Sequence, residues 1–178
     1  MTAISTTGVD ASALSAGLLI ARLVLGPPMI AHGTQKLFGW FGGYGLAGTG
    51  GFFESLGFRP GRAFAAAAAL AEVGGGLLVA LGFLGPVGPA LIISVMIVAA
   101  LTVHWGHGLL STSNGVEVPL LYAAGGLALA LTGYGAYSLD AILGLQSLWT
   151  PSVAWAVIGL GIAGGVANLF ARRPPATA

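Results

Sequence analysis

Residues 17–36, GLLIARLVLGPPMIAHGTQK, combine the apolar length of a membrane span with the charged or polar side chains of Arg22, His32 and Lys36. An arginine in the middle of a spanning helix costs about 2.5 to 3.5 kcal/mol on insertion scales, so it needs a partner in the protein interior or in a watery cavity. Glu72 is the one carboxylate inside another apolar segment. The sequence therefore predicts that Arg22 and Glu72 pair at the polar centre of a small helical membrane protein.

The composition of the whole chain agrees with a membrane protein. Of its 178 residues, 56% are hydrophobic and only 6% are charged, which is too few for the surface of a soluble domain. The 6 basic and 5 acidic residues form no cluster that could neutralise a run of phosphates, so nucleic acid is not an expected partner. There is no cysteine, which excludes disulfides, thiolate metal sites and a dithiol relay.

Apolar segments on both sides of residue 36 predict an all-α, polytopic fold, because each is close to the ~20 residues that a helix needs to cross a bilayer. The predicted spans are residues 14–36, 62–84, 87–105, 118–134 and 153–171. The first four would form a four-helix transmembrane bundle within residues 14–144. Residues 145–171 would add a fifth, C-terminal transmembrane helix.

The segments outside the spans have distinct compositions. Residues 1–13 predict a polar tail, and residues 172–178 predict a second tail that contains Arg172 and Arg173 followed by two prolines. The glycine- and phenylalanine-rich residues 51–56 predict an interfacial or re-entrant segment. Gly161 and Gly165 are spaced for close helix contact, so we expect the fifth helix to pack on the periphery of the bundle through them.

The basic residues predict the orientation in the membrane. With five spans, one side of the membrane receives Lys36, Arg59, Arg62, Arg172 and Arg173. The positive-inside rule assigns that side to the cytoplasm, with the N-terminus outside and the C-terminus inside.

A set of short motifs recurs in order along residues 17–144. They are Arg22-Leu-Val-Leu-Gly26, His32-Gly33, Lys36-Leu-Phe38, Gly51-Phe-Phe-Glu-Ser-Leu-Gly57, Glu72 followed by Gly75-Gly76, Asn114-Gly115, Glu117, Pro119-Leu-Leu121 and Ser138-Leu-Asp140. This array resembles the DoxX family of small integral membrane proteins, also described as DoxX/DoxD-like. The resemblance implies a multi-pass protein of a bacterial-type cell (inner) membrane.

The resemblance also implies a functional context. Family members are associated with quinone-linked thiosulfate oxidation and with membrane complexes that resist oxidative stress. The family's recurring polar positions correspond to Arg22, Lys36, Glu72, Glu117, Ser138 and Asp140. One departure is Ala136, where the family often has a basic residue, and it argues against an anion contact at that position.

Each polar candidate also has a purely structural interpretation. The predicted Arg22–Glu72 pair would either fix the register of the helices or handle a ligand or a proton. Glu117 is explained by the dipole at the start of the fourth span. Ser138 and Asp140 are explained by helix capping and by a turn.

The histidines are the remaining candidates for ligand binding. The interfacial interpretation is that His32, His104 and His107 bond to water or to the backbone. The alternative is haem ligation by His32 and His104, but two histidines without further ligands are not enough to predict haem. No metal cluster is expected from the sequence.

Two functions fit the sequence best. The first is an accessory, quinone-interacting subunit of a membrane redox or oxidative-stress complex. The sequence does not assign its cofactor, for which quinone is the candidate. The second is a non-catalytic scaffold or assembly subunit of a larger membrane complex. Both place the chain in contact with the lipid bilayer and with protein partners. A small transporter is less well supported, because one charge pair is little machinery for alternating access.

Overall fold

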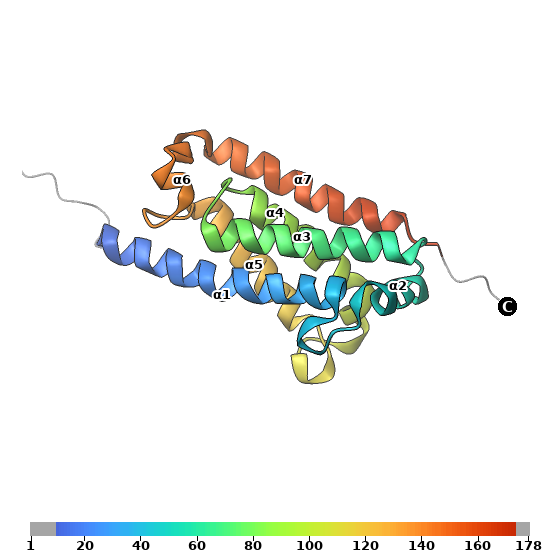
Figure 1. Ribbon diagram of the computed structural model, residues 1–178. Helices are drawn as coiled ribbons and strands as arrows, with labels where there is room; N and C mark the ends of the chain where they lie inside the picture. The colour runs from blue at the N-terminus through green and yellow to red at the C-terminus, as the bar shows by residue number, and fades with distance from the viewer. Residues whose placement is uncertain (1–9, 174–178) are drawn as a thin grey trace, which may run out of the picture.

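Long apolar helices account for most of residues 10–173, which are the residues that the computed structural model describes (Figure 1). No strand occurs among them. Their helices are α1 Ala11–Phe38, α2 Gly45–Ser55, α3 Gly61–Leu81, α4 Val87–Ala99, α5 Glu117–Thr132, α6 Leu139–Ile142 and α7 Pro151–Phe170. The chain continues beyond α4 as a π-helical segment, Ala100–His104, and a 3₁₀ turn, Trp105–His107. Further 3₁₀ turns are Trp40–Gly42, Ser111–Ser113 and Leu145–Leu148.

Four of these helical stretches are long and apolar enough to cross a membrane. They are Ala11–Phe38, Gly61–Leu81, Val87–His107 and Pro151–Phe170. The predicted fourth span corresponds to α5, which is apolar but has only 16 residues. The all-helical, multi-pass architecture is therefore confirmed, whereas the count of five spans stays a prediction. So does the division of the chain at residue 144.

The first helix begins earlier than predicted because Asp10 caps it. The Asp10 carboxylate accepts hydrogen bonds from the backbone N–H groups of Ser12 at 2.6 Å and Ala13 at 3.4 Å. These bonds satisfy donors that a helix start otherwise leaves free. Part of the predicted polar tail is thus helical. Residues 1–9, and residues 174–178 of the predicted C-terminal tail, lie outside the described residues.

Small residues bring α1 and α3 into close antiparallel contact along their length (Figure 1). A Cβ added to Gly26 would lie 2.7 Å from the backbone oxygen of Gly76. A Cβ added to Gly33 would lie 2.6 Å from the backbone oxygen of Ala69. Neither position has room for a side chain, so the four residues fix the register between the two helices.

The most apolar helix, α4, occupies the middle of the bundle and packs against α3, α5 and α7. Ile92 is fully buried, and Ile93 and Met96 are nearly so. Ile92 and Met96 join the cluster that contains Met29 of α1, while Ile93 packs with Ile158 of α7. The core therefore links the helices through α4.

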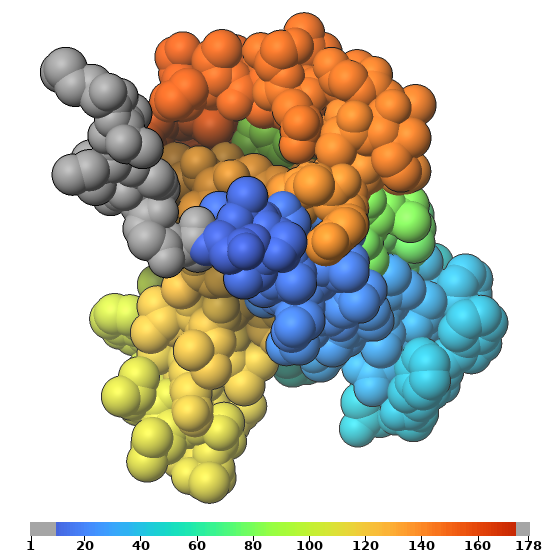
Figure 2. Space-filling model, turned by 90° about the vertical axis from the view of Figure 1, so that its left-hand side faces the viewer, coloured from blue at the N-terminus to red at the C-terminus, as the bar shows by residue number. Residues whose placement is uncertain are grey.

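The two ends of the bundle differ. At one end α2 packs on α3, and the chain after α7 returns to it, since the backbone N–H of Arg173 donates to the Gly57 oxygen at 2.8 Å (Figure 1). At the other end, the segment between α5 and α7 lies beside the start of α1. Figure 2 shows the segment in orange and the start of α1 in blue. Residues 51–56, predicted to be interfacial, fall largely within α2.

The C-terminal helix contacts α4 through the two glycines that the sequence predicted. A Cβ at Gly161 would lie 2.5 Å from the Ala90 oxygen, and one at Gly165 would lie 2.8 Å from the Ser94 oxygen. Replacing both glycines with leucine is therefore expected to push α7 away from α4 while α1, α3 and α4 stay folded. Limited proteolysis of the purified double variant should release α7 first. Leucine at the exposed Gly159 is the control, and global unfolding of the double variant would contradict a peripheral α7.

Candidate functional site

Arg22 is buried, as predicted, but backbone carbonyls hold it. The guanidinium Nη1 donates to the carbonyl oxygens of Tyr134 and Tyr137, each at 2.8 Å. Its Nη2 donates to the carbonyl oxygen of Ala80 at 3.3 Å. Only 2% of Arg22 is exposed, so these carbonyls take the place of water around the cation.

The predicted Arg22–Glu72 pair is wrong. Glu72 lies at the level of Gly33, because Gly33 packs between Ala69 and Val73 on α3. Eleven residues separate Arg22 from Gly33 along α1, which corresponds to about 16 Å at ~1.5 Å per residue. That separation is too large for the two side chains to meet.

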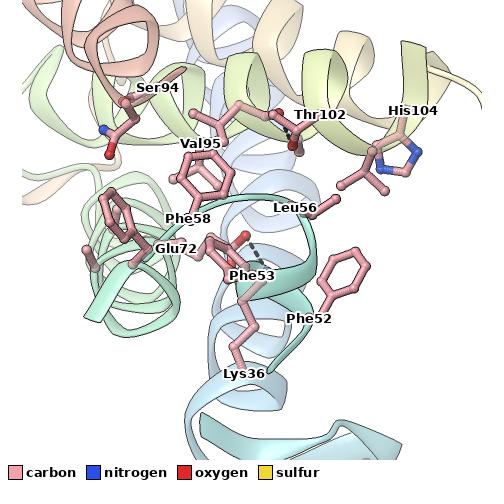
Figure 3. Close-up of a pocket in the computed structure, with 18 residues that line it drawn as sticks. Lys36, Phe52, Phe53, Leu56, Phe58, Glu72, Ser94, Val95, Thr102 and His104 are labelled. Atoms are coloured by element: carbon pink, nitrogen blue, oxygen red, sulfur yellow. Dashed lines mark hydrogen bonds and ion pairs between the residues drawn. The ribbon is translucent and has the colours of Figure 1, made fainter. Parts of the chain in front are cut away.

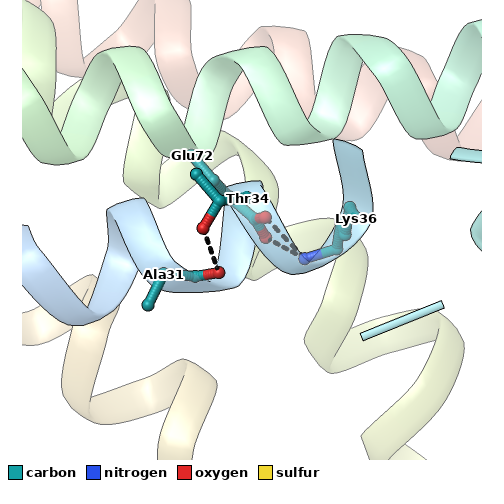
Figure 4. A network of polar contacts seen from close by, with 4 residues as sticks. All are labelled: Ala31, Thr34, Lys36 and Glu72. Carbon is teal, nitrogen blue, oxygen red and sulfur yellow. Dashed lines mark hydrogen bonds and ion pairs between the residues drawn. The ribbon is translucent and has the colours of Figure 1, made fainter. Parts of the chain in front are cut away.

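The partner of Glu72 is Lys36, which lies about one helical turn beyond Gly33 toward the C-terminal end of α1. Its Nζ lies 2.6 Å from Oε1 and 2.5 Å from Oε2 of Glu72 (Figure 4). The Glu72 side chain is 3% exposed and the Lys36 side chain 26% exposed. The lysine stem thus reaches from a partly open position to a buried carboxylate.

Asp140 and Ser138 anchor the segment after α5 to the turn between α3 and α4. The Asp140 carboxylate accepts hydrogen bonds from the backbone N–H groups of Leu84 at 2.9 Å and Gly85 at 2.7 Å. Its own N–H donates to the Gly82 oxygen at 3.0 Å. Ser138 caps α6, since its hydroxyl accepts from the backbone N–H of Ala141 at 3.2 Å. Asp140 therefore does more than form a local turn.

Gly82 brings these anchors together with Arg22. It ends α3 with a positive φ of 65°, a conformation that favours glycine. A Cβ there would lie 2.7 Å from Nη1 of Arg22 and 2.6 Å from Cβ of Ser138. Arg22, Ser138 and Asp140 thus surround one turn. The buried Arg22 guanidinium and the buried Asp140 carboxylate therefore lie at the same end of the bundle.

A cavity of about 280 Å³ lies between α2, α3 and α4 and ends at the Lys36–Glu72 pair (Figure 3). We call it the phenylalanine cavity. Its lining residues are Lys36, Phe52, Phe53, Leu56, Phe58, Phe64, Ala67, Ala68, Ala71, Glu72, Ser94, Val95, Val98, Ala99, Thr102, Val103, His104 and Asn168. The Phe58 ring packs against Phe53 at 5.6 Å and Phe64 at 5.2 Å between centroids. The cavity is therefore a mainly apolar space, with an ion pair and a few further polar side chains in its wall.

A second cavity, of about 580 Å³, also has Lys36 in its lining. It is lined by His32, Gln35, Lys36, Gly42, Gly43, Tyr44, Gly48, Thr49 and Phe52. Lys36 and Phe52 line both cavities. We call this second space the polar vestibule, because most of its side chains are polar.

The remaining candidates lie apart from one another. His32 lines the polar vestibule and packs edge-on to Tyr122, with 6.1 Å between ring centroids. His104 lines the phenylalanine cavity, and its Nδ1 lies 2.8 Å from the Asn114 oxygen. Within residues 10–173, no three histidine, aspartate or glutamate side chains group in a way that could hold a metal ion.

Glu117 lies at the start of a helix, as the sequence indicated, and also bonds to the loop before it. It is the first residue of α5, and its carboxylate accepts a hydrogen bond from the backbone N–H of Ser111 at 2.7 Å. This bond holds the pKa of the Glu117 carboxyl below its usual value. The contact orders the loop before α5 and lies outside both cavities.

The sequence of residues 17–105 matches the model of the DoxX family. The chain belongs to the DoxX family. Comparisons with curated proteins and with solved structures gave no match. Family membership and the four apolar helices together make the chain a multi-pass integral membrane protein in contact with the lipid bilayer.

The part of this DoxX protein that matches the family contains both members of the ion pair and nearly all of the phenylalanine cavity. It also contains Arg22, His32 and His104, whereas Glu117, Ser138 and Asp140 follow it. Of the cavity lining, sequence reasoning named the polar candidates Lys36, Glu72 and His104 but not the apolar residues. The signal that could have found them is the aromatic run of α2, which precedes the small, alanine-rich face of α3.

Proposed function

We propose that this DoxX-family protein binds a lipid-soluble quinone in the phenylalanine cavity and serves as the membrane subunit of a redox or oxidative-stress complex. The observation that supports it best is the Lys36–Glu72 pair in the wall of a mainly apolar space. Small-molecule sites are usually apolar cavities in which a few polar groups fix the orientation of the ligand.

The chemistry of the cavity suits a quinone ring. Phenylalanine faces and alanine methyl groups provide apolar contact for a flat ring, while the carbonyl oxygens of a quinone accept hydrogen bonds. Lys36 Nζ has three N–H donors and contacts the two carboxylate oxygens of Glu72. The third N–H can therefore donate to a ligand oxygen. His104 offers a second polar group on the α4 side of the cavity.

The wall on the α4 side includes the π-helical segment Ala100–His104. Single π-helical turns within α-helices are rare and are frequent at functional sites. Here the segment contributes Thr102, Val103 and His104 to the cavity. This irregularity supports a ligand site at this position along α4.

A partner protein would supply the electrons. The chain has no cysteine and therefore no dithiol of its own. The accessory role predicted from the sequence is consistent with this composition. The alternative is a scaffold or assembly subunit without a quinone, which would need neither the cavity nor the ion pair.

We also propose five membrane crossings, with the N-terminus outside and the C-terminus in the cytoplasm of a bacterial-type cell. In Figure 1, α4 runs toward the α2 end, whereas α7 begins at the opposite end. The chain between them returns through α5, which supports α5 as a crossing. The basic residues at the α2 end support a cytoplasmic location for that end.

Quinone binding is tested by filling the cavity. Ala71→Leu adds three carbon atoms to the lining and is expected to weaken binding of a short-tailed ubiquinone or menaquinone analogue about tenfold, which is ~1.4 kcal/mol. Ala63→Leu, on the exposed face of the same helix, is the matched control and should bind as the unmodified protein does. Binding is measured by titrating the analogue into purified protein in mild detergent. Equal affinity of the two variants would contradict the site, and absent binding in the unmodified protein would favour the assembly role.

A further inference from the structure

We infer that the polar vestibule is a water-filled entry through which protons reach the Lys36–Glu72 pair. The inference rests on the proposed function only for the destination of the proton, which is a ligand in the phenylalanine cavity. The entry itself follows from the two cavities and from Lys36, which lines both.

The vestibule has the size and polarity that water needs. A buried water requires about 10 to 15 Å³ of such space and two to four polar partners. The vestibule offers about 580 Å³, with His32, Gln35 and Thr49 among its polar lining. The phenylalanine cavity has about half that volume, so it has room for less water.

Lys36 is the polar side chain that lines both spaces. Its 26% exposure contrasts with the 3% exposure of Glu72, which lines only the phenylalanine cavity. A proton that travels from the vestibule to Glu72 by this route therefore passes through the lysine. Other titratable groups around the pair are His32 and Tyr44 in the vestibule, Tyr122 of α5 and His104 across the phenylalanine cavity.

The transfer is balanced in two steps. The Lys36 ammonium gives a proton to the Glu72 carboxylate, which leaves a neutral amine and a neutral carboxylic acid. The amine then takes a proton from a hydronium ion in the vestibule and releases water. The net result is one proton on Glu72 and an ammonium restored on Lys36.

Thiol chemistry tests whether the vestibule holds water. The chain has no cysteine, so a single introduced cysteine can be followed without background. Thr49, in the vestibule wall, is only 7% exposed, so Thr49→Cys can react with a small charged methanethiosulfonate reagent in the folded protein only through water in the vestibule, and we expect it to react. Ala65→Cys, on α3 with no exposed surface, is the control and should stay unreacted until the protein is unfolded. Protection of Thr49→Cys in the folded protein would overturn the inference.

Infrared difference spectroscopy tests whether the vestibule delivers protons. After a jump from neutral to acid pH, the carbonyl band of protonated Glu72 should appear, and Glu72→Gln identifies the band by removing it. Labelling Thr49→Cys with a bulky neutral thiol reagent should slow the rise of the band about tenfold, a barrier of ~1.4 kcal/mol. The same label on Ser113→Cys, in the exposed loop before α5, should leave the rate unchanged.

The outcomes separate this inference from the proposed function. An unchanged rate in labelled Thr49→Cys would overturn the vestibule, while the effect of Ala71→Leu on quinone binding would stand. A slowed rate in a protein that binds no quinone would support the vestibule and contradict only the quinone site.

Discussion

Replacing Lys36 with methionine is expected to destabilise the protein by about 3 to 5 kcal/mol, because it leaves the Glu72 carboxylate buried without a partner. The carboxylate is only 3% exposed and has Lys36 as its ion-pair partner. Neutralising the carboxylate in the same protein, as in the double variant Lys36→Met with Glu72→Gln, should restore most of that stability. Thermal unfolding in detergent measures both effects.

The two single variants should not be equivalent. In Glu72→Gln the lysine keeps its charge, but 26% of its side chain is already exposed toward the polar vestibule. A flexible ammonium can turn toward that water, so Glu72→Gln should cost less than Lys36→Met. Equal losses of stability in the two single variants would contradict the effect expected from the difference in burial. Additive losses in the double variant would mean that Lys36 and Glu72 do not interact.

Membrane-spanning helices were well predicted because their signal is local. The apolar segments predicted for α1, α3 and α7 overlap the observed helices, and the boundaries differ by a few residues where a cap extends them, as Asp10 does for α1. The α7 contact through Gly161 and Gly165 was also predicted, because small residues spaced four apart lie on one helix face. Such features need no knowledge of distant partners.

Partners across helices were harder to predict. The burial of Arg22 and Glu72 followed from their apolar surroundings, but pairing them required the register of α1 against α3. That register depends on where Gly26 and Gly33 contact α3, which spacing along one helix does not reveal. The sequence placed Lys36 and Arg62 on the same side of the membrane but did not fix how α1 and α3 align, and a different alignment exchanges one cation for the other.

Contacts that join remote loops were missed for a related reason. Asp140 binds the backbone of Leu84 and Gly85, more than fifty residues earlier in the chain. The sequence around Asp140 resembles an ordinary turn, and no local pattern reports a distant backbone donor. The phenylalanine cavity likewise needs the folding of α2 onto α3 and α4 before its rings share one space.

Arg22→Met should be as damaging as Lys36→Met, for a different reason. The substitution deprives the Ala80, Tyr134 and Tyr137 carbonyls of a donor, and each buried group left unsatisfied costs about 1 to 3 kcal/mol. It also removes the cation that shares the Gly82 turn with buried Asp140. We expect the segment after α5 to loosen from α1, with a loss of about 3 to 5 kcal/mol in thermal unfolding.

Combining Arg22→Met with Glu72→Gln distinguishes the observed arrangement from the predicted one. The two residues lie about 16 Å apart along the bundle and have no shared partner, and sites farther apart than about 7 to 10 Å usually contribute additively to stability within ~0.5 kcal/mol. The double variant should therefore lose the sum of the two single losses. Recovery of stability in it would mean that Arg22 and Glu72 interact after all, and that the carbonyl contacts of Arg22 do not account for its burial.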